Sequence, residues 1–514
     1  MKQRSWALAA LVIASSAPWA QDHPGKGPIG HDNGAYFACT GVTSSGLAVI
    51  CVRNDGSGNG SQANPMGSIQ AAIDAAKAGD VIAVAAGTYV ENPVLGSETE
   101  YSSKNLTLLG GYASDFGSRD AEAFVTTIDG GLTARVMTFY VIANAESRID
   151  GFVVTHGVTS TATGNSGGGI HAEQMGSGPF VISHNLIVDY HTDPADNEAH
   201  GGGILANAVD WDGGEPAIVI EHNTVSNNTA GKGGGLTVAG HRIVLRQNLI
   251  ENNQGSNDHG GGVYVSSAST LISNNIIRNN AIGAIGWGWG GGMVIPDANA
   301  DLEGNVFAGN YSPSLGSQLF WDEGASGTMR NELLYGSPCN QAGEQASMLY
   351  IDGGSPGGSH VVIDNMTLAD YPNCPNALTQ QAIFVQADSS AVIRNSILWN
   401  VGTEFTTIDN ATYTITHSLT GETGVGNFLN NPRFVDSQNG DYHLQSIGGH
   451  YTANGWVNDA TTSPAIDAGN PASSFANEPA PNGGRINLGA FGNTAQASRN
   501  TVSPDDIFAN GFES

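Results

Sequence analysis

A row of side chains that could take part in a reaction or bind a ligand recurs along the middle of the sequence, and each member lies directly before a run of three glycines. We call this row the file. Its members are Ser166, His200, Lys232, His259 and Trp289. They are spaced 27 to 34 residues apart. Imidazole and amine groups can transfer protons, and an indole offers a flat apolar surface. If the repeats stack, these side chains line one face, within reach of a ligand that runs parallel to the stack.

Two acidic insertions lie beside this file in the sequence. Their carboxylates are Asp193, Asp196, Glu198, Asp210 and Asp212. Carboxylate oxygens are the ligands that Ca²⁺ prefers, so the insertions predict an optional Ca²⁺ site, although no cofactor is required. The alternative is a solvated acidic surface without metal.

Three tryptophans accompany the file: Trp211, Trp287 and Trp289. Their rings are candidates for stacking on the rings of a sugar ligand. The alternative is that they shield the glycine-rich corner. Each histidine likewise has an alternative role as a solvated or turn-stabilising side chain.

A short motif, apolar-x-x-Asn-x-apolar, repeats with nearly the same period as the file. The elements that this motif forms should therefore position the file. Its asparagines are Asn185, Asn223, Asn248, Asn275, Asn305, Asn365 and Asn395, with looser copies at Asn331 and His417. Apolar residues on both sides of a polar turn residue predict two short strands joined by a tight bend, with Asn adopting the unusual backbone angles.

Periods of 25 to 38 residues match one coil of a parallel β-solenoid. In such a stack equivalent residues lie about 4.8 Å apart, so the asparagines should form an interior hydrogen-bonded ladder beside columns of Ile and Val. The glycine triplets, such as Gly201–Gly203, predict a corner that needs positive φ or close backbone approach.

Composition and charge exclude several classes of protein. The chain has 71 glycines in 514 residues without a G-X-Y period, and 40% of its residues are hydrophobic, so neither collagen nor a disordered chain fits. The net charge of −29 opposes binding to nucleic acid and to anionic membranes. It also opposes a polyanionic glycan unless a cation such as Ca²⁺ intervenes.

The N-terminus has the layout of a secretory signal peptide. Lys2 and Arg4 precede an apolar stretch, and small residues at Ala17 and Ala20 offer two cleavage sites. A buried N-terminal helix is the alternative. We expect export and, because no later apolar stretch approaches about 18 residues, no transmembrane segment.

Four cysteines in an exported chain predict two disulfides between sequence-local partners. The pairs are Cys39 with Cys51 and Cys339 with Cys374. A metal site is the weaker alternative, because no C-x-x-C spacing is present.

Several passages resemble right-handed parallel β-helix proteins with a pectin-lyase-like fold. GSIQAAIDAAKAGDVIAVAAGTYVEN at 67–92 is similar to the opening of that family, and residues 108–131 are similar to its first coils. SPAIDAGNP at 463–471 and GGRINLGAFG at 483–492 resemble the closing region of envelope-associated members of the choice-of-anchor type. The resemblance spans residues 65–495 and implies an all-β fold.

We therefore expect a right-handed parallel β-helix (solenoid) with an N-terminal helical cap and an irregular C-terminal cap. The expected units are a signal peptide (1–20), an N-terminal segment with the Cys39–Cys51 pair (21–66), the β-helix (67–425), a C-terminal capping or anchor-like region (426–495) and a tail (496–514). Caps are needed because an open solenoid end exposes strand edges and core.

The resemblance implies two classes of function. Uronate lyases of this fold use Ca²⁺ and a basic residue that removes the C5 proton. Lys232 or His259 would be that base here, with Asp258 beside it and His200 in the same file. The polygalacturonase motifs and the paired arginines of classical pectate lyases are missing, which puts catalysis in doubt.

We therefore predict a secreted or cell-surface protein that binds glycan or mediates adhesion without established catalysis. Its partner would be a polysaccharide or cell-surface glycan, its state a monomer, and its location outside the cell or in the outer envelope of a Gram-negative bacterium. A Ca²⁺-dependent polysaccharide lyase or other polysaccharide-active enzyme is the alternative, and a purely structural role is a third.

Overall fold

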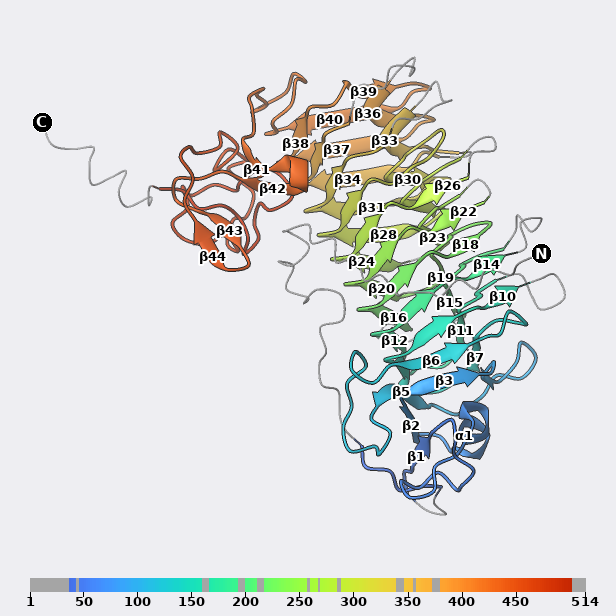
Figure 1. Ribbon diagram of the computed structural model, residues 1–514. Coiled ribbons are helices and arrows are strands. Elements are labelled where there is room, and N and C mark those ends of the chain that lie inside the picture. The colour runs from blue at the N-terminus through green and yellow to red at the C-terminus, as the bar shows by residue number, and fades with distance from the viewer. Residues whose placement is uncertain are drawn as a thin grey trace, which may run out of the picture.

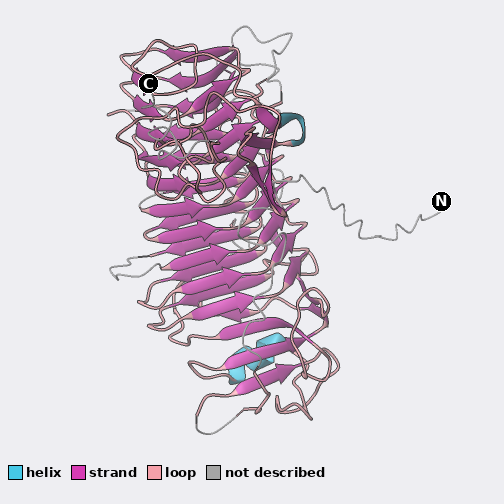
Figure 2. Cartoon of the chain, turned by 90° about the vertical axis from the view of Figure 1, so that its left-hand side faces the viewer, coloured by secondary structure: helices cyan, strands magenta, loops and turns pink. Residues whose placement is uncertain are grey.

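The fold is an elongated stack of parallel coils with helix α1 at one end and the C-terminal region against one side near the other (Figures 1 and 2). It comes from a computed structural model of the chain. The structure describes residues 37–42, 46–159, 166–192, 199–209, 217–256, 259–266, 269–283, 288–338, 346–354, 357–371 and 380–501.

Three long parallel sheets form the sides of the stack. Sheet 1, which follows the glycine triplets, contains β4 (Val94–Leu95), β7 (Met137–Val141), β11 (Ile170–Gln174), β15 (Ile204–Ala208), β19 (Leu236–Gly240), β23 (Val263–Ser266), β27 (Met293–Pro296), β30 (Leu319–Asp322), β33 (Ala346–Ile351), β36 (Gln380–Val385) and β39 (Thr403–Thr407). Alternate side chains of these strands point into the shared core.

Sheet 2 follows sheet 1 within each coil. It contains β1 (Val49–Val52), β2 (Val81–Ala85), β5 (Thr107–Tyr112), β8 (Ser147–Asp150), β12 (Phe180–Ser183), β16 (Ile218–Glu221), β20 (Ile243–Arg246), β24 (Thr270–Ser273), β28 (Asn299–Glu303), β31 (Ser326–Arg330), β34 (His360–Asp364), β37 (Ser390–Arg394) and β40 (Thr412–Thr416). Because β1 pairs with β2, the sheet begins inside the segment assigned to residues 21–66.

Sheet 3 follows the asparagine turn. It contains β3 (Gly87–Val90), β6 (Thr126–Asp129), β9 (Val153–Thr155), β13 (Leu186–Val188), β17 (Thr224–Ser226), β21 (Leu249–Glu251), β25 (Ile276–Arg278), β29 (Val306–Ala308), β32 (Leu333–Tyr335), β35 (Thr367–Ala369) and β38 (Ile397–Trp399). A short sheet completes the middle coils with β10 (Val158–Thr159), β14 (His191–Thr192), β18 (Thr229–Ala230), β22 (Gln254–Gly255) and β26 (Ala281–Ile282).

The predicted asparagine ladder runs along the interior between sheets 2 and 3. In each step Nδ2 donates to Oδ1 of the next coil, at 3.1 Å from Asn185 to Asn223 and from Asn223 to Asn248, and at 3.0 Å from Asn248 to Asn275 and from Asn275 to Asn305. All five side chains are buried. The stacking of like residues, on which the predicted rod depends, is therefore confirmed over these coils.

The assignment of the turn geometry to these asparagines is wrong. The left-handed backbone belongs to the preceding residue, for example His184 with φ 54° and His222 with φ 55°. This leaves the ladder side chains pointing inward, where they also satisfy backbone groups such as the carbonyl of Ile182.

Asn331, Asn365 and Asn395 belong to a different column from the ladder. They themselves adopt positive φ, and Glu332 and Ser396 occupy the interior positions one residue later. A shift of one residue reverses the face to which strand side chains point, which explains why Val362 is 42% exposed.

A second interior ladder, which sequence reasoning missed, lies between sheet 3 and the short sheet. Its members are Asn228, Asn253, Asn280 and Asn310, joined by Nδ2 to Oδ1 bonds of 3.0 to 3.1 Å and closed by Gln318 at 2.6 Å. Each asparagine comes five residues after a member of the first ladder, so the signal was present in the sequence.

Both predicted reasons for the glycine triplets hold at Gly201 and Gly202. Gly201 has φ 63°, in the region that favours glycine. A Cβ on Gly202 would lie 2.3 Å from the carbonyl oxygen of Gly234 in the next coil. The corner therefore combines a left-handed turn with close contact between coils.

The N-terminal end is closed as predicted by a short helix, α1 (Ile69–Ala75). Ser68 caps it by accepting a hydrogen bond from the amide of Ala71 at 3.2 Å, and Ile69 and Ile73 are buried against the first coils. The Cys39–Cys51 disulfide is present, with Cα atoms 5.7 Å apart. Cys339 and Cys374 lie outside the described residues.

The C-terminal region packs mainly against the outer face of sheet 3. It contains two antiparallel hairpins, β41 (Phe434–Asp436) with β42 (Asp441–Leu444) and β43 (His450–Thr452) with β44 (Gly455–Val457), and a 3₁₀ turn, η2 (Ser437–Asn439). Tyr442 and Ala490 pack on Val306, Leu333 and Ala369 of the solenoid. The end itself is continued by single bridges from Ile397 to Leu419 and from Leu419 to Phe428.

No helix within the described part of the chain has the length and apolar character needed to cross a membrane.

Candidate functional site

The predicted file stacks in register on successive coils. The amide of the first glycine in each triplet donates to the carbonyl of the file residue in the next coil: Gly201 to Lys232 at 3.0 Å, and Gly233 to His259 at 3.1 Å. Bridges join His200 to Lys232 and His259 to Trp289. The chain places the file here because each triplet turns the backbone sharply into sheet 1.

The file side chains are half-buried, and the rings of its histidines contact neighbouring aromatic rings. The ring of His259 lies edge-on to Trp289 with centroids 4.5 Å apart, and His200 lies edge-on to Tyr264 at 5.5 Å. Lys232 is also half-buried between the coils of the two histidines. The arrangement can offer imidazole, ammonium and indole groups to a ligand lying along the stack.

A row of aromatic side chains continues from the file across the outer face of sheet 1. Trp289 is followed by Phe320 at 5.9 Å, Tyr350 at 5.1 Å and Phe384 at 4.9 Å between successive ring centroids. Phe320, Tyr350 and Phe384 are each at most 3% exposed, whereas Trp289 is half-buried. The aromatic surface that a ligand can reach is therefore at the file and not along the whole sheet.

A pair of carboxyl groups that sequence reasoning missed lies on the same sheet. Asp322 ends β30 and Asp352 follows β33 on the next coil, because Trp321 pairs with Ile351. Burial raises the pKa of Asp322 to about 7, and repulsion from Asp352 makes a smaller contribution in the same direction. The shared aromatic-x-Asp pattern in FWD at 320–322 and YID at 350–352 is the signal that could have revealed the pair.

Several predicted site residues lie outside the described residues. They are Asp193, Asp196, Glu198, Asp210, Trp211, Asp212, Asp258 and Trp287. Within the described ranges no group of three or more His, Cys, Asp or Glu side chains could hold a metal ion. The Ca²⁺ site and the partnership of Asp258 with His259 thus remain predictions.

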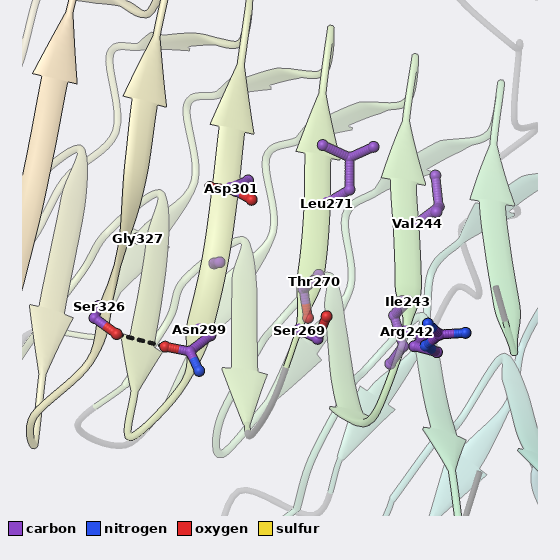
Figure 3. Close-up of a pocket in the computed structure, with 11 residues that line it drawn as sticks. Arg242, Ile243, Val244, Ser269, Thr270, Leu271, Asn299, Asp301, Ser326 and Gly327 are labelled. Atoms are coloured by element: carbon purple, nitrogen blue, oxygen red, sulfur yellow. Dashed lines mark hydrogen bonds between the residues drawn. The ribbon is translucent and has the colours of Figure 1, made fainter. Parts of the chain in front are cut away.

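A shallow hollow of about 330 Å³ lies on a different face, the outer side of sheet 2 (Figure 3). Figure 3 shows Arg242, Leu271, Asn299, Asp301 and Ser326 projecting along neighbouring strands around it. The hydroxyl of Ser326 donates to Asn299. None of the predicted site residues lines this hollow.

Comparison with known proteins agrees with this geometry. Residues 150–324 match the model of the right-handed β-helix region family. The chain is a right-handed parallel β-helix. Residues 409–469 of this β-helix protein match the model of the disaggregatase-related family, and no curated protein matches its sequence.

Two solved structures are similar to the β-helix protein at low identity. Pectate lyase Pel9A is 15% identical with a TM-score of 0.44, over 87% of this chain and 97% of that one. The PL6 family alginate lyase AlyGC is 14% identical with a TM-score of 0.29, over 70% of this chain and 53% of that one. Neither likeness supports an argument about substrate or reaction, so we base the proposed function on the site itself.

Proposed function

We propose that this β-helix protein binds a polysaccharide or cell-surface glycan along the file of His200, Lys232, His259 and Trp289, without catalysis. The observation that carries the proposal is the stacking of these four half-buried side chains on four successive coils. An extended chain of sugars lying parallel to the solenoid axis would meet one side chain per coil. Trp289 would stack on a ring, and the imidazoles and the ammonium would bind hydroxyl or acidic groups.

Burial of the Asp322 carboxyl group on sheet 1 favours binding over catalysis. General acid–base chemistry needs a donor and an acceptor within hydrogen-bonding reach of the substrate. Asp322, whose pKa burial raises to about 7, is only 6% exposed. An adhesion-type role needs only the accessible file.

The proposal includes export, because residues 1–20 have the layout of a signal peptide. We place the mature protein outside the cell or in the outer envelope of a Gram-negative bacterium, as a monomer. Ca²⁺ is an optional addition that would let a polyanionic glycan approach a chain of net charge −29.

Glycan binding by the mature chain tests the proposal. We expect Lys232→Ala and Trp289→Ala to weaken binding of whichever glycan is retained on an array by roughly five- to thirtyfold, the range for losing one stacking or charged contact. Lys77→Ala, at an exposed position beside α1, is the matched control for charge and should bind normally. Equal binding by all three variants would contradict the proposed site.

A Ca²⁺-dependent polysaccharide lyase is the second candidate, because the file contains two imidazoles and an amine that could remove a proton. A lyase would release unsaturated uronate products that absorb in the ultraviolet. We expect no such product from several polyanionic glycans, with or without Ca²⁺. Turnover that Lys232→Ala or His259→Ala abolishes would replace the binding proposal with the enzymatic one.

A further inference from the structure

A polar cleft of about 340 Å³ lies between sheet 2 and the C-terminal region. The outward side chains at the ends of three neighbouring strands, β31, β34 and β37, line one wall: Arg330, Asp364 and Arg394. Asn470 and Asn493 of the C-terminal region line the other wall. The volume is at the lower end of the range for sites that bind small molecules.

The two arginines of this cleft have different surroundings. Arg394 forms an ion pair with Asp364 at 2.9 Å. Arg330 lies opposite Asp364 in the register of the paired strands, but the two side chains do not form an ion pair. The guanidinium of Arg330 has no hydrogen-bonding or ionic partner within the described residues. Lys and Arg number 18 in the chain against 47 Asp and Glu, so an unpaired guanidinium in a cleft is a local reversal of the overall charge.

The remaining polar atoms of the cleft include both donors and acceptors. Asn331 and Asn365 use their Nδ2 groups to bind backbone carbonyls of the C-terminal region, which leaves each Oδ1 as an acceptor. Oδ1 of Asn470 accepts from Ala472, and Oδ1 of Asn493 accepts from the amide of residue 477, which leaves both Nδ2 groups as donors. A ligand hydroxyl both donates and accepts, so it suits such a wall.

We propose that this cleft binds a small acidic sugar, with its carboxylate on Arg330 and its hydroxyls on the asparagine amides. A planar carboxylate matches the two-pronged geometry of a single guanidinium. A doubly charged phosphate would call for a second free cation, whereas Arg394 is committed to Asp364. The inference uses none of the residues of the file and therefore stands independently of the proposed function.

Direct titration of the mature chain tests the proposal, with glucuronate as the probe, glucose as its neutral counterpart and glucose 6-phosphate as the competing anion. Calorimetry should show saturable binding of glucuronate with a dissociation constant on the order of 1 mM, and much weaker binding of the other two. Arg330→Ala should weaken glucuronate binding roughly tenfold or more.

Arg246→Ala is the matched control. Arg246 ends β20 at the equivalent strand position, pairs with Glu221 and lies outside the cleft, so its loss should leave glucuronate binding unchanged. Asn470→Ala should weaken binding less than Arg330→Ala, and unchanged melting temperatures would show that both variants are folded.

Three results would overturn the inference: no saturable binding of glucuronate, equal binding by Arg330→Ala, or equal affinity for glucose. Tighter binding of glucose 6-phosphate would assign the site to a phosphate instead of a carboxylate. Loss of glucuronate binding in Lys232→Ala but not in Arg330→Ala would move the sugar to the file and refute the cleft.

Discussion

The first ladder ends on a single buried carboxyl group, that of Glu332. Glu332 occupies the interior position after Asn305, and its Oε1 accepts from Asn305 Nδ2 at 3.1 Å. It is fully buried, Oε2 has no partner within the described residues, and burial raises the pKa of the carboxyl group well above 4.5. The ladder thus ends on a carboxyl group whose burial favours the protonated form.

Glu332→Gln should stabilise the protein at neutral pH by roughly 1 to 3 kcal/mol, the range for an unsatisfied buried polar group. The amide accepts the same hydrogen bonds without needing a bound proton. Because the folded pKa of Glu332 is raised, its full contribution to stability is present below about pH 4.5 and is lost as pH rises. Melting temperatures of both proteins at several pH values check this, and a difference that does not shrink in acid would contradict it.

Asn275→Leu should destabilise the protein by about 3 kcal/mol or more. Asn275 Nδ2 donates to the carbonyl of Leu245 at 2.8 Å and to Asn305, and its Oδ1 accepts from Asn248. A leucine would remove these three hydrogen bonds and would also leave the buried backbone amide of Asn248 without Oδ1 of Asn275 as its acceptor. Denaturant unfolding measures the loss, with Asn299→Leu on the exposed outer face of sheet 2 as control. Similar midpoints for the two variants would argue against the ladder.

At the scale of elements, the shifted asparagines attach the C-terminal region to the solenoid. Asn331 Nδ2 donates to the carbonyls of Ala490 and Gly492 at 2.9 and 2.7 Å. Asn365 donates to the carbonyl of Gly489 at 3.1 Å on the next coil, and Asn395 accepts from the amide of Asn470 at 2.7 Å. Three successive turns therefore present outward amides to one neighbouring segment.

Asn365→Ala should loosen the C-terminal region while leaving the coils folded. The variant loses two hydrogen bonds to backbone carbonyls, which corresponds to about 1 to 3 kcal/mol. Limited proteolysis should cut residues 430–500 faster, and hydrogen exchange in the middle coils should be unchanged. Asn274→Ala, at the same turn position several coils away, is the control. Equal protease resistance of all three proteins would exclude this role.

At the scale of the whole molecule, carboxyl groups with opposite pKa shifts limit the pH range of stability. The pKa of Asp322 and that of Glu478 are both raised to about 7 by burial, so their contributions to stability are lost as pH rises through about 7. Hydrogen bonds and charges from His184 and Arg119 outweigh burial at Asp150 and lower its pKa, so its contribution is lost as pH falls below 3.8.

We therefore expect thermal stability to be greatest near pH 4 and to decline as pH rises to about 7, a decline that the net charge of −29 reinforces. Asp322→Asn should reduce this decline, because the amide has no proton to lose. Scanning calorimetry of both proteins across this range checks the prediction. A wild-type melting temperature that rises from pH 5 to pH 7 would refute it.

The coil length, the interior asparagine column, the glycine corner, the file and the capping helix could all be predicted from the amino-acid sequence. These depend on short phrases that repeat, such as IEHN around Asn223 and LRQN around Asn248, and a stack turns each repeat into a column. The column that Asn365 joins could not be predicted, because a shift of one residue within a turn changes the direction of the side chain without changing the local pattern. Likewise, the cleft at Arg330 forms between strand ends and a C-terminal region far apart in sequence, where no local motif records which residues become neighbours.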